Sequence, residues 1–195
     1  MTETPVIASS YTFDPFARHK FYHDVNQSLV HRAIARLDEA HPKGKPVRVV
    51  ELASGTGAVT ELILDELERL GRPGTVIGVE PSPEAIEIAS ARLEARGARF
   101  VQGEADSLVQ VAPNADAIFF CNAIHLVPDK RAAARQIASA LAPDGFFACN
   151  SAFYQGTYAP GSERFYHLWT RRALGWLRKN HPGVRTARTE KAMAM

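Results

Sequence analysis

The sequence contains few cysteines and no long apolar run, and these two absences exclude several classes of protein. Only Cys121 and Cys149 occur among 195 residues, so we expect no disulfide framework. No group of His and Cys has zinc-site spacing, so we expect no metal site. No apolar run approaches the roughly 20 residues of a membrane span, and the N-terminus lacks a signal-peptide pattern. We therefore expect a cytoplasmic protein whose two thiols are buried in strands as small hydrophobic groups.

A strong overall charge is also absent, but the charge is unevenly distributed. The formal net charge is only +2, yet residues 163–195 contain eight Lys and Arg against two acids. A basic segment of this kind is typical of a solvated helix face or of a surface that meets an acidic substrate or partner. Nucleic acid is the least expected of its partners.

The most informative segment is residues 49–57, which reads VVELASGTG. It predicts a buried strand that enters a small-residue turn, and an apolar-periodic helix follows at residues 59–70. Gly55 and Gly57 would allow unusual backbone angles and a close approach of the main chain to a ligand. Glu51 places a carboxylate beside that ligand, which disfavours a dinucleotide diphosphate and favours a cationic ligand. Capping or pairing with a neighbouring group is the alternative role for Glu51.

A second acidic residue, Glu80, follows the glycine turn at a sequence spacing typical of nucleotide-binding folds. Residues 75–81 read TVIGVEP, a short apolar strand that ends in Glu80, 25 residues after Gly55. A carboxylate about 20 residues beyond a glycine turn, at the tip of the second strand, typically accepts hydrogen bonds from a ribose diol. The two segments together predict a site for a nucleoside-containing ligand.

Apolar runs and helical periodicity alternate along the chain and predict an α/β fold with a doubly wound, mostly parallel sheet. The expected strands are near residues 47–53, 75–80, 98–103, 115–121 and 145–152, and the expected helices near 57–70, 83–96 and 130–141. Residues 21–40 predict a further helix, with inward positions at Val25, Leu29, Ala33 and Leu37. Residues 163–180 predict an amphipathic one.

The motifs resemble those of class I S-adenosylmethionine-dependent methyltransferases, in particular a small-molecule group that includes quinone-biosynthesis enzymes. ELASGTG resembles the first family motif, with Ala53 where the family prefers glycine, and GVEPSP resembles the second. Residues 102–108, 116–129 and 141–147 resemble three later motifs, so the resemblance covers residues 45–153. It implies a Rossmann-like methyltransferase fold and S-adenosyl-L-methionine as cofactor.

The resemblance also implies which residues contact the cofactor. Glu104 and Ala105 stand where the family holds the adenine, although Asp106 could take the role of Glu104 by a two-residue shift. Asn122 would border the methionine end, or would cap the next helix. The expected cofactor-binding residues are Glu51, Ala53, Gly55, Gly57, Glu80, Pro81, Glu104, Ala105 and Asn122.

Residues for the acceptor and for proton transfer are less clearly marked. His125 is the one His within the motifs, and His is the residue type best suited to general-base catalysis near neutral pH. It is therefore the candidate catalytic base, with a structural role as the alternative. Aromatic residues of the N-terminal segment and of the segment after the fifth strand suggest a flat or hydrophobic small-molecule acceptor. Tyr11, Tyr22 and Tyr154 are the expected substrate residues.

We expect three parts: an N-terminal helical cover at 1–44, a cofactor-binding core at 45–153 and a basic helical segment at 154–195. Residues 184–195 predict no strand, so the last two strands of the family's sheet are not found. This favours an incomplete chain, a gene fragment or one half of an assembly, with a natural minimal version as the alternative. A homodimer or a partner chain could then complete the sheet.

The sequence therefore predicts a methyltransferase acting on a small molecule, or a non-catalytic cofactor-binding fragment, pseudoenzyme or partner subunit. An NAD-dependent oxidoreductase is disfavoured because Thr60 stands where the third glycine would permit close packing of helix and strand. A nucleic-acid methyltransferase is disfavoured because CNAIH follows the fourth strand in place of an Asn/Asp-Pro-Pro-Tyr/Phe motif.

Overall fold

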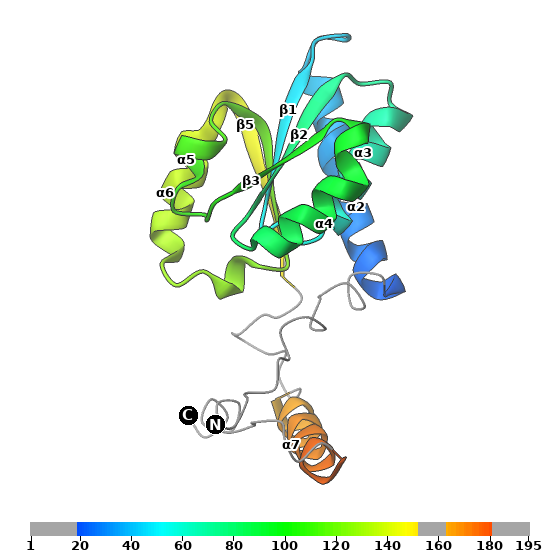
Figure 1. Ribbon diagram of the computed structural model, residues 1–195, viewed down its shortest axis with the longest axis vertical. Helices are drawn as coiled ribbons and strands as arrows, with labels where there is room; N and C mark the ends of the chain where they lie inside the picture. The colour runs from blue at the N-terminus through cyan, green and yellow to red at the C-terminus, as the bar shows by residue number, and fades with distance from the viewer. Residues whose placement is uncertain (1–18, 152–162, 181–195) are drawn as a thin grey trace. The chain divides into compact units, whose positions relative to one another are not determined.

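The computed structural model describes residues 19–151 and 163–180, and the chain divides into two compact units, 1–153 and 154–195. The first unit contains a five-stranded sheet (Figure 1). Its strands are β1 (Val47–Leu52), β2 (Gly74–Glu80), β3 (Ala98–Gln102), β4 (Ala115–Cys121) and β5 (Leu141–Asn150). They lie in the order β3-β2-β1-β4-β5, and every neighbouring pair is parallel. The predicted doubly wound α/β fold is confirmed.

Helices cover both faces of this sheet. One face carries α2 (Lys20–Ala40), α3 (Ala58–Arg69) and α4 (Pro83–Leu93), and the other carries α5 (Leu108–Val111) and α6 (Lys130–Ala140) (Figure 1). Two short 3₁₀ helices, η1 (Glu94–Arg96) and η2 (Ile124–Leu126), complete the described elements of the unit. Helix α5 was not predicted from the sequence, because its four residues are too few for helical periodicity to be recognised.

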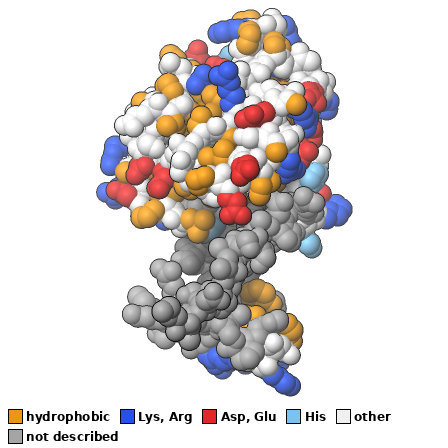
Figure 2. Space-filling view, in the orientation of Figure 1, with side chains coloured by type: hydrophobic (Ala, Val, Ile, Leu, Met, Phe, Trp, Pro, Cys, Tyr) orange, Lys and Arg blue, Asp and Glu red, His pale blue; other side chains and the backbone are white. Residues whose placement is uncertain are grey.

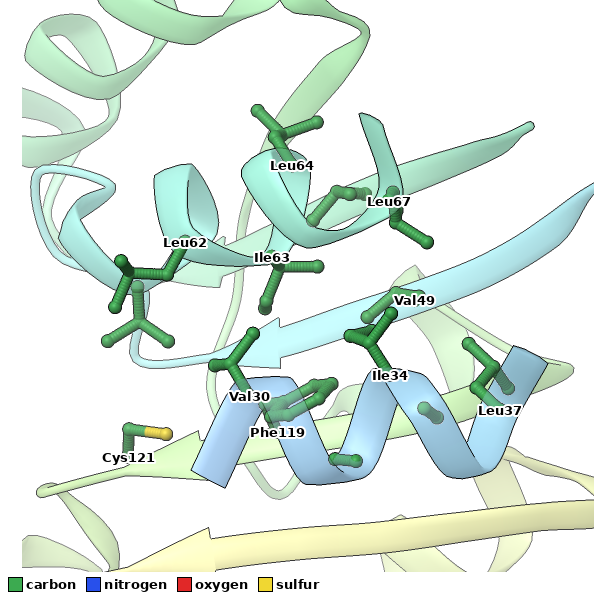
Figure 3. Packing of buried hydrophobic residues seen from close by; sticks show 14 of the residues in the cluster. Val30, Ile34, Leu37, Val49, Leu62, Ile63, Leu64, Leu67, Phe119 and Cys121 are labelled. Carbon is green, nitrogen blue, oxygen red and sulfur yellow. The ribbon is translucent and has the colours of Figure 1, made fainter. Parts of the chain in front are cut away.

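The core on the first face is built from aliphatic residues at helical spacing. Val30, Ile34 and Leu37 of α2 are fully buried and point toward the sheet (Figure 3). Each such side chain stabilises the fold by about 1.5–3 kcal/mol. The sequence placed Val25 on this inward stripe, but Val25 is 40% exposed. The buried position in that turn is occupied instead by Asn26, a polar residue.

The predicted positions of the helix ends are largely confirmed by local chemistry. Ser82 caps α4 by accepting from the Ala85 backbone N–H, and Pro83 occupies the first turn, where a missing amide is harmless. Gly71 and Gly97 follow their helices with φ of +60° and +91°, the left-handed conformation that ends a helix.

One expectation about the core is wrong. Cys121 is buried as expected, but Cys149 is exposed. Strand β5 is the outermost strand of the described sheet, so Cys149 has a neighbouring strand on one side alone. β5 also begins at Leu141, four residues before the predicted start.

The second unit contains α7 (Glu163–Asn180), at the predicted position. Leu174 is buried, whereas Trp169 and Trp176 are exposed. Hydrophobic and basic side chains lie on different sides of the helix (Figure 2). The basic residues of α7 are exposed, and their role as a solvated face or as a surface for a partner stays a prediction.

Candidate functional site

The carboxyl ends of β1, β2 and β4 meet at one edge of the sheet and carry most of the residues singled out from the sequence. The strand order reverses between β1 and β4, and in open α/β sheets the ligand crevice forms at such a switch point, outside the carboxyl ends. Glu51 lies near the end of β1, Glu80 ends β2 and Asn122 follows β4. The sheet therefore brings together side chains that are far apart in sequence.

The loop between β1 and α3 has an alternating left-handed backbone. Ala53, Gly55 and Gly57 have φ of +54°, +53° and +87°. A Cβ at Gly57 would lie 2.7 Å from Cδ1 of Leu93 in α4, whereas a Cβ at Gly55 would meet no atom within 4 Å. Gly57 is therefore required for packing against α4, while Gly55 borders open space in which a ligand can approach the backbone.

Glu80 joins this loop to the start of α4. Its Oε2 accepts from the Gly55 backbone N–H at 2.9 Å, and its Oε1 accepts from the Ser82 N–H at 3.2 Å. A carboxylate has about four acceptor positions, so about two remain for a ligand. The side chain is buried, with a relative exposure of 9%, and it is suited to receiving two hydroxyl groups of a diol.

Glu51 is a second buried carboxyl group beside the same loop. Its exposure is 2%, and Oε2 accepts a hydrogen bond from the Thr60 hydroxyl. Burial raises the pKa of Glu51 to about 8, and the nearby Glu80 adds to the rise, although the Thr60 hydrogen bond opposes it. A positive ligand charge would favour the ionised form of Glu51, whereas a diphosphate would oppose its ionisation.

A cluster of three amides, two of them buried, lies at the ends of β4 and β5. Oδ1 of Asn26 accepts from Nδ2 of Asn122 at 3.1 Å and from Nδ2 of Asn150 at 2.8 Å. Asn122 has φ of +56°, a conformation that Asn tolerates better than most residues. Its backbone N–H donates to the Asn150 backbone oxygen and to Oδ1, both at 3.1 Å. This cluster connects α2 to the switch point.

Tyr22 lies beside these amides. It is 7% exposed, and burial followed by the nearby Glu51 raises the pKa of Tyr22 to about 12, against the effect of hydrogen bonds with Asn122 and Asn26. The phenol therefore stays protonated at neutral pH. Of the other expected substrate residues, Tyr11 and Tyr154 lie outside the described residues.

The edge beyond β2 and β3 forms an open hollow of about 420 Å³. Pro81 and Glu104 line it together with Asp106. Both acidic side chains are exposed, so the choice between them stays open. Ala105 is partly buried against the core of the second face. The hollow lies where β2 and β3 end, and β1 separates these strands from β4, which Asn122 follows.

His125 lies in η2 and is half-buried. Its Nδ1 lies 3.1 Å from the hydroxyl oxygen of Ser151. This contact links η2 to the residue that follows β5, a partner that the sequence did not suggest. It orients the imidazole ring without assigning a catalytic role to it.

The sequence reasoning also missed Asn26 and Asn150. Neither belongs to a motif, but Asn26 interrupts the inward stripe of α2 between Tyr22 and Val30. A polar residue on a buried stripe is the signal that could have found it. No pattern marked Asn150, because its role depends on contacts across the sheet.

Two absences hold for residues 19–151 and 163–180. No group of three or more His, Cys, Asp or Glu in this part of the chain could hold a metal ion. None of its helices is long and apolar enough to cross a membrane.

Comparison with known proteins points to one family. Residues 49–145 match a family described as a methyltransferase domain. The fatty-acid O-methyltransferase of Mycolicibacterium smegmatis is 31% identical over 119 residues, which cover 61% of this chain and 40% of that enzyme. The chain therefore spans less than half the length of this relative.

Two solved structures show the same fold. The CMeT domain of the citrinin polyketide synthase aligns with 28% identity and a TM-score of 0.54, over 60% of this chain and 32% of that one. The DszA carbon methyltransferase aligns with a TM-score of 0.64 over 75% of this chain and 41% of that one. Its identity of 16% makes this a likeness of fold alone.

Proposed function

Because this chain belongs to the class I S-adenosylmethionine-dependent methyltransferase family, we propose that it binds S-adenosyl-L-methionine and transfers the methyl group to a small molecule. The observation that carries the proposal is the pair of buried carboxyl groups, Glu51 and Glu80, on either side of a glycine loop. This pair is suited to a ligand that combines a ribose diol with positive charge.

The residues fit such a cofactor along the whole edge of the sheet. Glu80 would accept from the two ribose hydroxyls through charge-assisted hydrogen bonds, and the open space at Gly55 would admit the ligand beside the backbone. Glu51 and Asn122 would face the cationic amino-acid end. Ala53 and Gly57 would shape the loop. Pro81 and Glu104, which line the hollow, would border the adenine together with the adjacent Ala105.

The cofactor would supply an electrophilic methyl group on a positively charged sulfur. Transfer of this methyl group to an acceptor atom would release S-adenosylhomocysteine. The protein's part is to hold the acceptor in line with the sulfur–methyl bond, which can contribute about 7–11 kcal/mol. Water exclusion and orientation therefore matter more here than a protein nucleophile.

An acceptor that carries a proton must also lose it. His125 is the candidate base, because imidazole titrates near neutral pH. In the tautomer in which Nδ1–H donates to the Ser151 hydroxyl, 3.1 Å away, Nε2 would be the basic atom that takes the proton. General-base assistance of this kind is typically a factor of about 10²–10⁴ in rate.

For the acceptor we propose a hydrophobic small molecule. The 31% identical relative is a fatty-acid O-methyltransferase, and the citrinin synthase domain belongs to an enzyme of polyketide synthesis. Both observations support an acceptor with an apolar chain. Buried Tyr22 would contribute aromatic surface to its site.

A second candidate function is cofactor binding without turnover, as a pseudoenzyme or a subunit of an assembly. The position of β5 favours this function. Among the described residues, β5 is the outermost strand at one side of the sheet and pairs with β4 alone. Its outer edge could therefore pair with a further strand. A second copy or a partner chain would then pair there. Labelled-methyl transfer to a long-chain fatty acid, with the chain alone, separates this candidate from the enzyme.

The residue assignment is tested by comparing Glu80→Ala with His125→Ala. The first variant should weaken binding of S-adenosylhomocysteine by about 10- to 100-fold, because it removes hydrogen bonds to a charged acceptor. The second should leave that affinity nearly unchanged and act on the rate of transfer. Calorimetric titration measures both, and equal losses of affinity would contradict the assignment.

A further inference from the structure

Thr60 is a buried polar residue in the first turn of α3, and it is not among the residues that would contact the cofactor. Its side chain is 0% exposed, in a helix whose neighbouring positions Val59 and Ile63 are buried and apolar. A buried hydroxyl group is costly unless it is hydrogen-bonded. The Thr60 hydroxyl donates to Oε2 of Glu51, near the end of β1, so Glu51 explains why a polar residue occupies this position.

The start of α3 brings a second donor of Thr60 to the same carboxyl group. Gly57 is the N-cap residue and makes no side-chain cap, so it cannot accept from the backbone N–H groups of the first turn as Ser, Thr, Asp or Asn would. The Thr60 backbone N–H faces the Glu51 carboxyl group instead. The amino end of a helix also favours a nearby negative charge. Glu51 thus takes the place of the missing N-cap side chain, and Thr60 holds it.

The other groups packed around Glu51 do not favour a negative charge there. Glu80 of β2 has the same sign, and burial of the Glu51 carboxyl group opposes its ionisation. Burial also raises the pKa of Tyr22 in α2 and of Cys121 in β4, so both are uncharged at neutral pH. Among the described residues, Thr60 is therefore the group that favours the carboxylate form of Glu51.

A carboxylate held in this way still has room for a ligand. It has about four acceptor positions, of which the hydroxyl and the backbone N–H of Thr60 occupy two, so about two remain. The hydrogen bond to Oε2 also limits rotation of the carboxyl group. The arrangement suits an ammonium donor, which supplies the positive charge that the surroundings of Glu51 lack.

We propose that Thr60 is a positioning residue: it holds the Glu51 carboxyl group in the orientation in which it receives the ammonium of the cofactor's amino-acid end. The proposal rests on the proposed function. Thr60 would act through Glu51 without contacting the cofactor.

The test uses two ligands that share the adenosine part. S-adenosylhomocysteine carries the amino-acid part, and 5′-methylthioadenosine lacks it. Thr60→Val removes the hydroxyl group and keeps the size of the side chain. It should weaken binding of the first ligand by about tenfold or more, as expected for a hydrogen bond to a charged group. Binding of the second should change less than about twofold, because Glu80 and the hollow are untouched. Calorimetric titration gives both affinities.

Three further variants separate positioning from general destabilisation. Thr60→Ser keeps the hydroxyl group and should retain most of the affinity, whereas Thr60→Ala should show the same selective loss as Thr60→Val. Leu67→Ala removes a buried side chain of the same helix, about 10 Å along it from Thr60 at 1.5 Å per residue. It should lower the melting temperature without changing either affinity.

A double variant tests whether Thr60 acts through Glu51. Glu51→Gln alone should weaken binding of S-adenosylhomocysteine, because the ammonium loses its charged partner. Adding Thr60→Val to Glu51→Gln should then cost less than about twofold more. Independent actions would instead give losses that multiply.

The pH dependence of binding gives a readout that a packing defect does not. The Thr60 hydrogen bond lowers the pKa of Glu51, so its removal costs most where the free carboxyl group is still protonated. The loss of affinity in Thr60→Val should therefore shrink as the pH rises from 7 to 9. Titration of the ligand's own amino group affects both proteins equally and cancels in the ratio of their affinities.

The outcomes are distinct. A loss for S-adenosylhomocysteine alone in Thr60→Val and Thr60→Ala, absent from Thr60→Ser and Leu67→Ala, supports the proposal. Equal losses for both ligands, no loss for either, or losses that multiply in the double variant overturn it. They leave the proposed function standing, with Thr60 and Glu51 as a helix cap. If the unaltered protein binds neither ligand, the proposed function fails and this inference fails with it.

Discussion

At the scale of single residues, Glu51 has the most unusual chemistry. It is a carboxyl group buried beneath the loop, and burial raises its pKa to about 8. At pH 7 the folded protein therefore holds a proton there that the unfolded chain releases. A cationic ligand beside Glu51 would favour the ionised carboxylate over the protonated form. Binding of such a ligand would therefore lower the pKa of Glu51.

The raised pKa predicts a pH-dependent effect of Glu51→Gln. Between the ordinary glutamate pKa of 4.5 and the raised pKa of about 8, the folded state binds more protons than the unfolded state. Glu51 therefore lowers stability progressively as pH rises through this window. Glutamine does not titrate. The variant should therefore gain stability over the unaltered protein at pH 8 and differ little at pH 5, as measured by thermal unfolding.

The matched control is Glu87→Gln, at an exposed position of α4. Its effect should be similar at both pH values. A gain for Glu51→Gln that is as large at pH 5 as at pH 8 would contradict a raised pKa.

Much of the site at this scale could be predicted from sequence. Glu51 and Glu80 each stand at the end of an apolar run, so strand pattern and spacing suffice to locate them. Asn26 could not be assigned in this way, because its partners are 96 and 124 residues away in the chain. Only the packing of α2 on the sheet brings them together, and helix propensity does not specify that packing.

At the scale of elements, the β1–α3 loop uses its two glycines differently. Both have positive φ, but Gly57 also packs directly against Leu93 of α4. Gly55 has open space where a side chain would be. The sequence motif predicts both glycines and does not distinguish their roles.

The two alanine substitutions should therefore have opposite main effects. Gly57→Ala forces Cβ within 2.7 Å of Leu93 in addition to the strain of about 1–2 kcal/mol for a left-handed alanine. It should lower the free energy of unfolding clearly more than Gly55→Ala, which should chiefly weaken cofactor binding. Urea unfolding and calorimetric titration of both variants measure this. A larger stability loss in Gly55→Ala would be inconsistent with the packing.

At the scale of the whole α/β unit, a buried ion pair lies at the end of the sheet opposite to the proposed binding site. Arg72 precedes β2 and is almost completely buried, with 1% of its side chain exposed. It pairs with Asp38 and donates to the carbonyl oxygens of Asp38, His41, Pro42 and Lys45. The Arg72 side chain therefore connects the end of α2 and the segment after it to the start of β2, at the end of the sheet where the strands begin.

Arg72→Met should therefore destabilise the unit without affecting the site. It leaves Asp38 without its guanidinium partner and removes the donors to four carbonyl groups. Arg96→Met, which removes more exposed ion pairs with Asp65 and Glu68, should lower the melting temperature much less. Below its melting temperature, Arg72→Met should bind S-adenosylhomocysteine as the unaltered protein does. A loss of affinity in the folded variant would show that the two ends of the sheet are coupled.

The overall architecture could be predicted from the alternation of strand and helix patterns in the sequence, because each strand is a distinct apolar run. The error at Cys149 arose because an apolar run does not reveal which strand is outermost. The early start of β5 has a similar cause: Pro143 and Asp144 read as a turn, yet the chain around them is extended. Local sequence therefore determined the elements, and their burial depended on the assembled sheet.

The most direct measurement is calorimetric titration of the chain with S-adenosyl-L-methionine, S-adenosylhomocysteine and NADH. Two buried carboxyl groups around an open glycine loop predict binding of the first two ligands and none of NADH, whose diphosphate would face Glu51. Binding of NADH, or no binding of S-adenosyl-L-methionine and S-adenosylhomocysteine by the folded chain, would contradict the account.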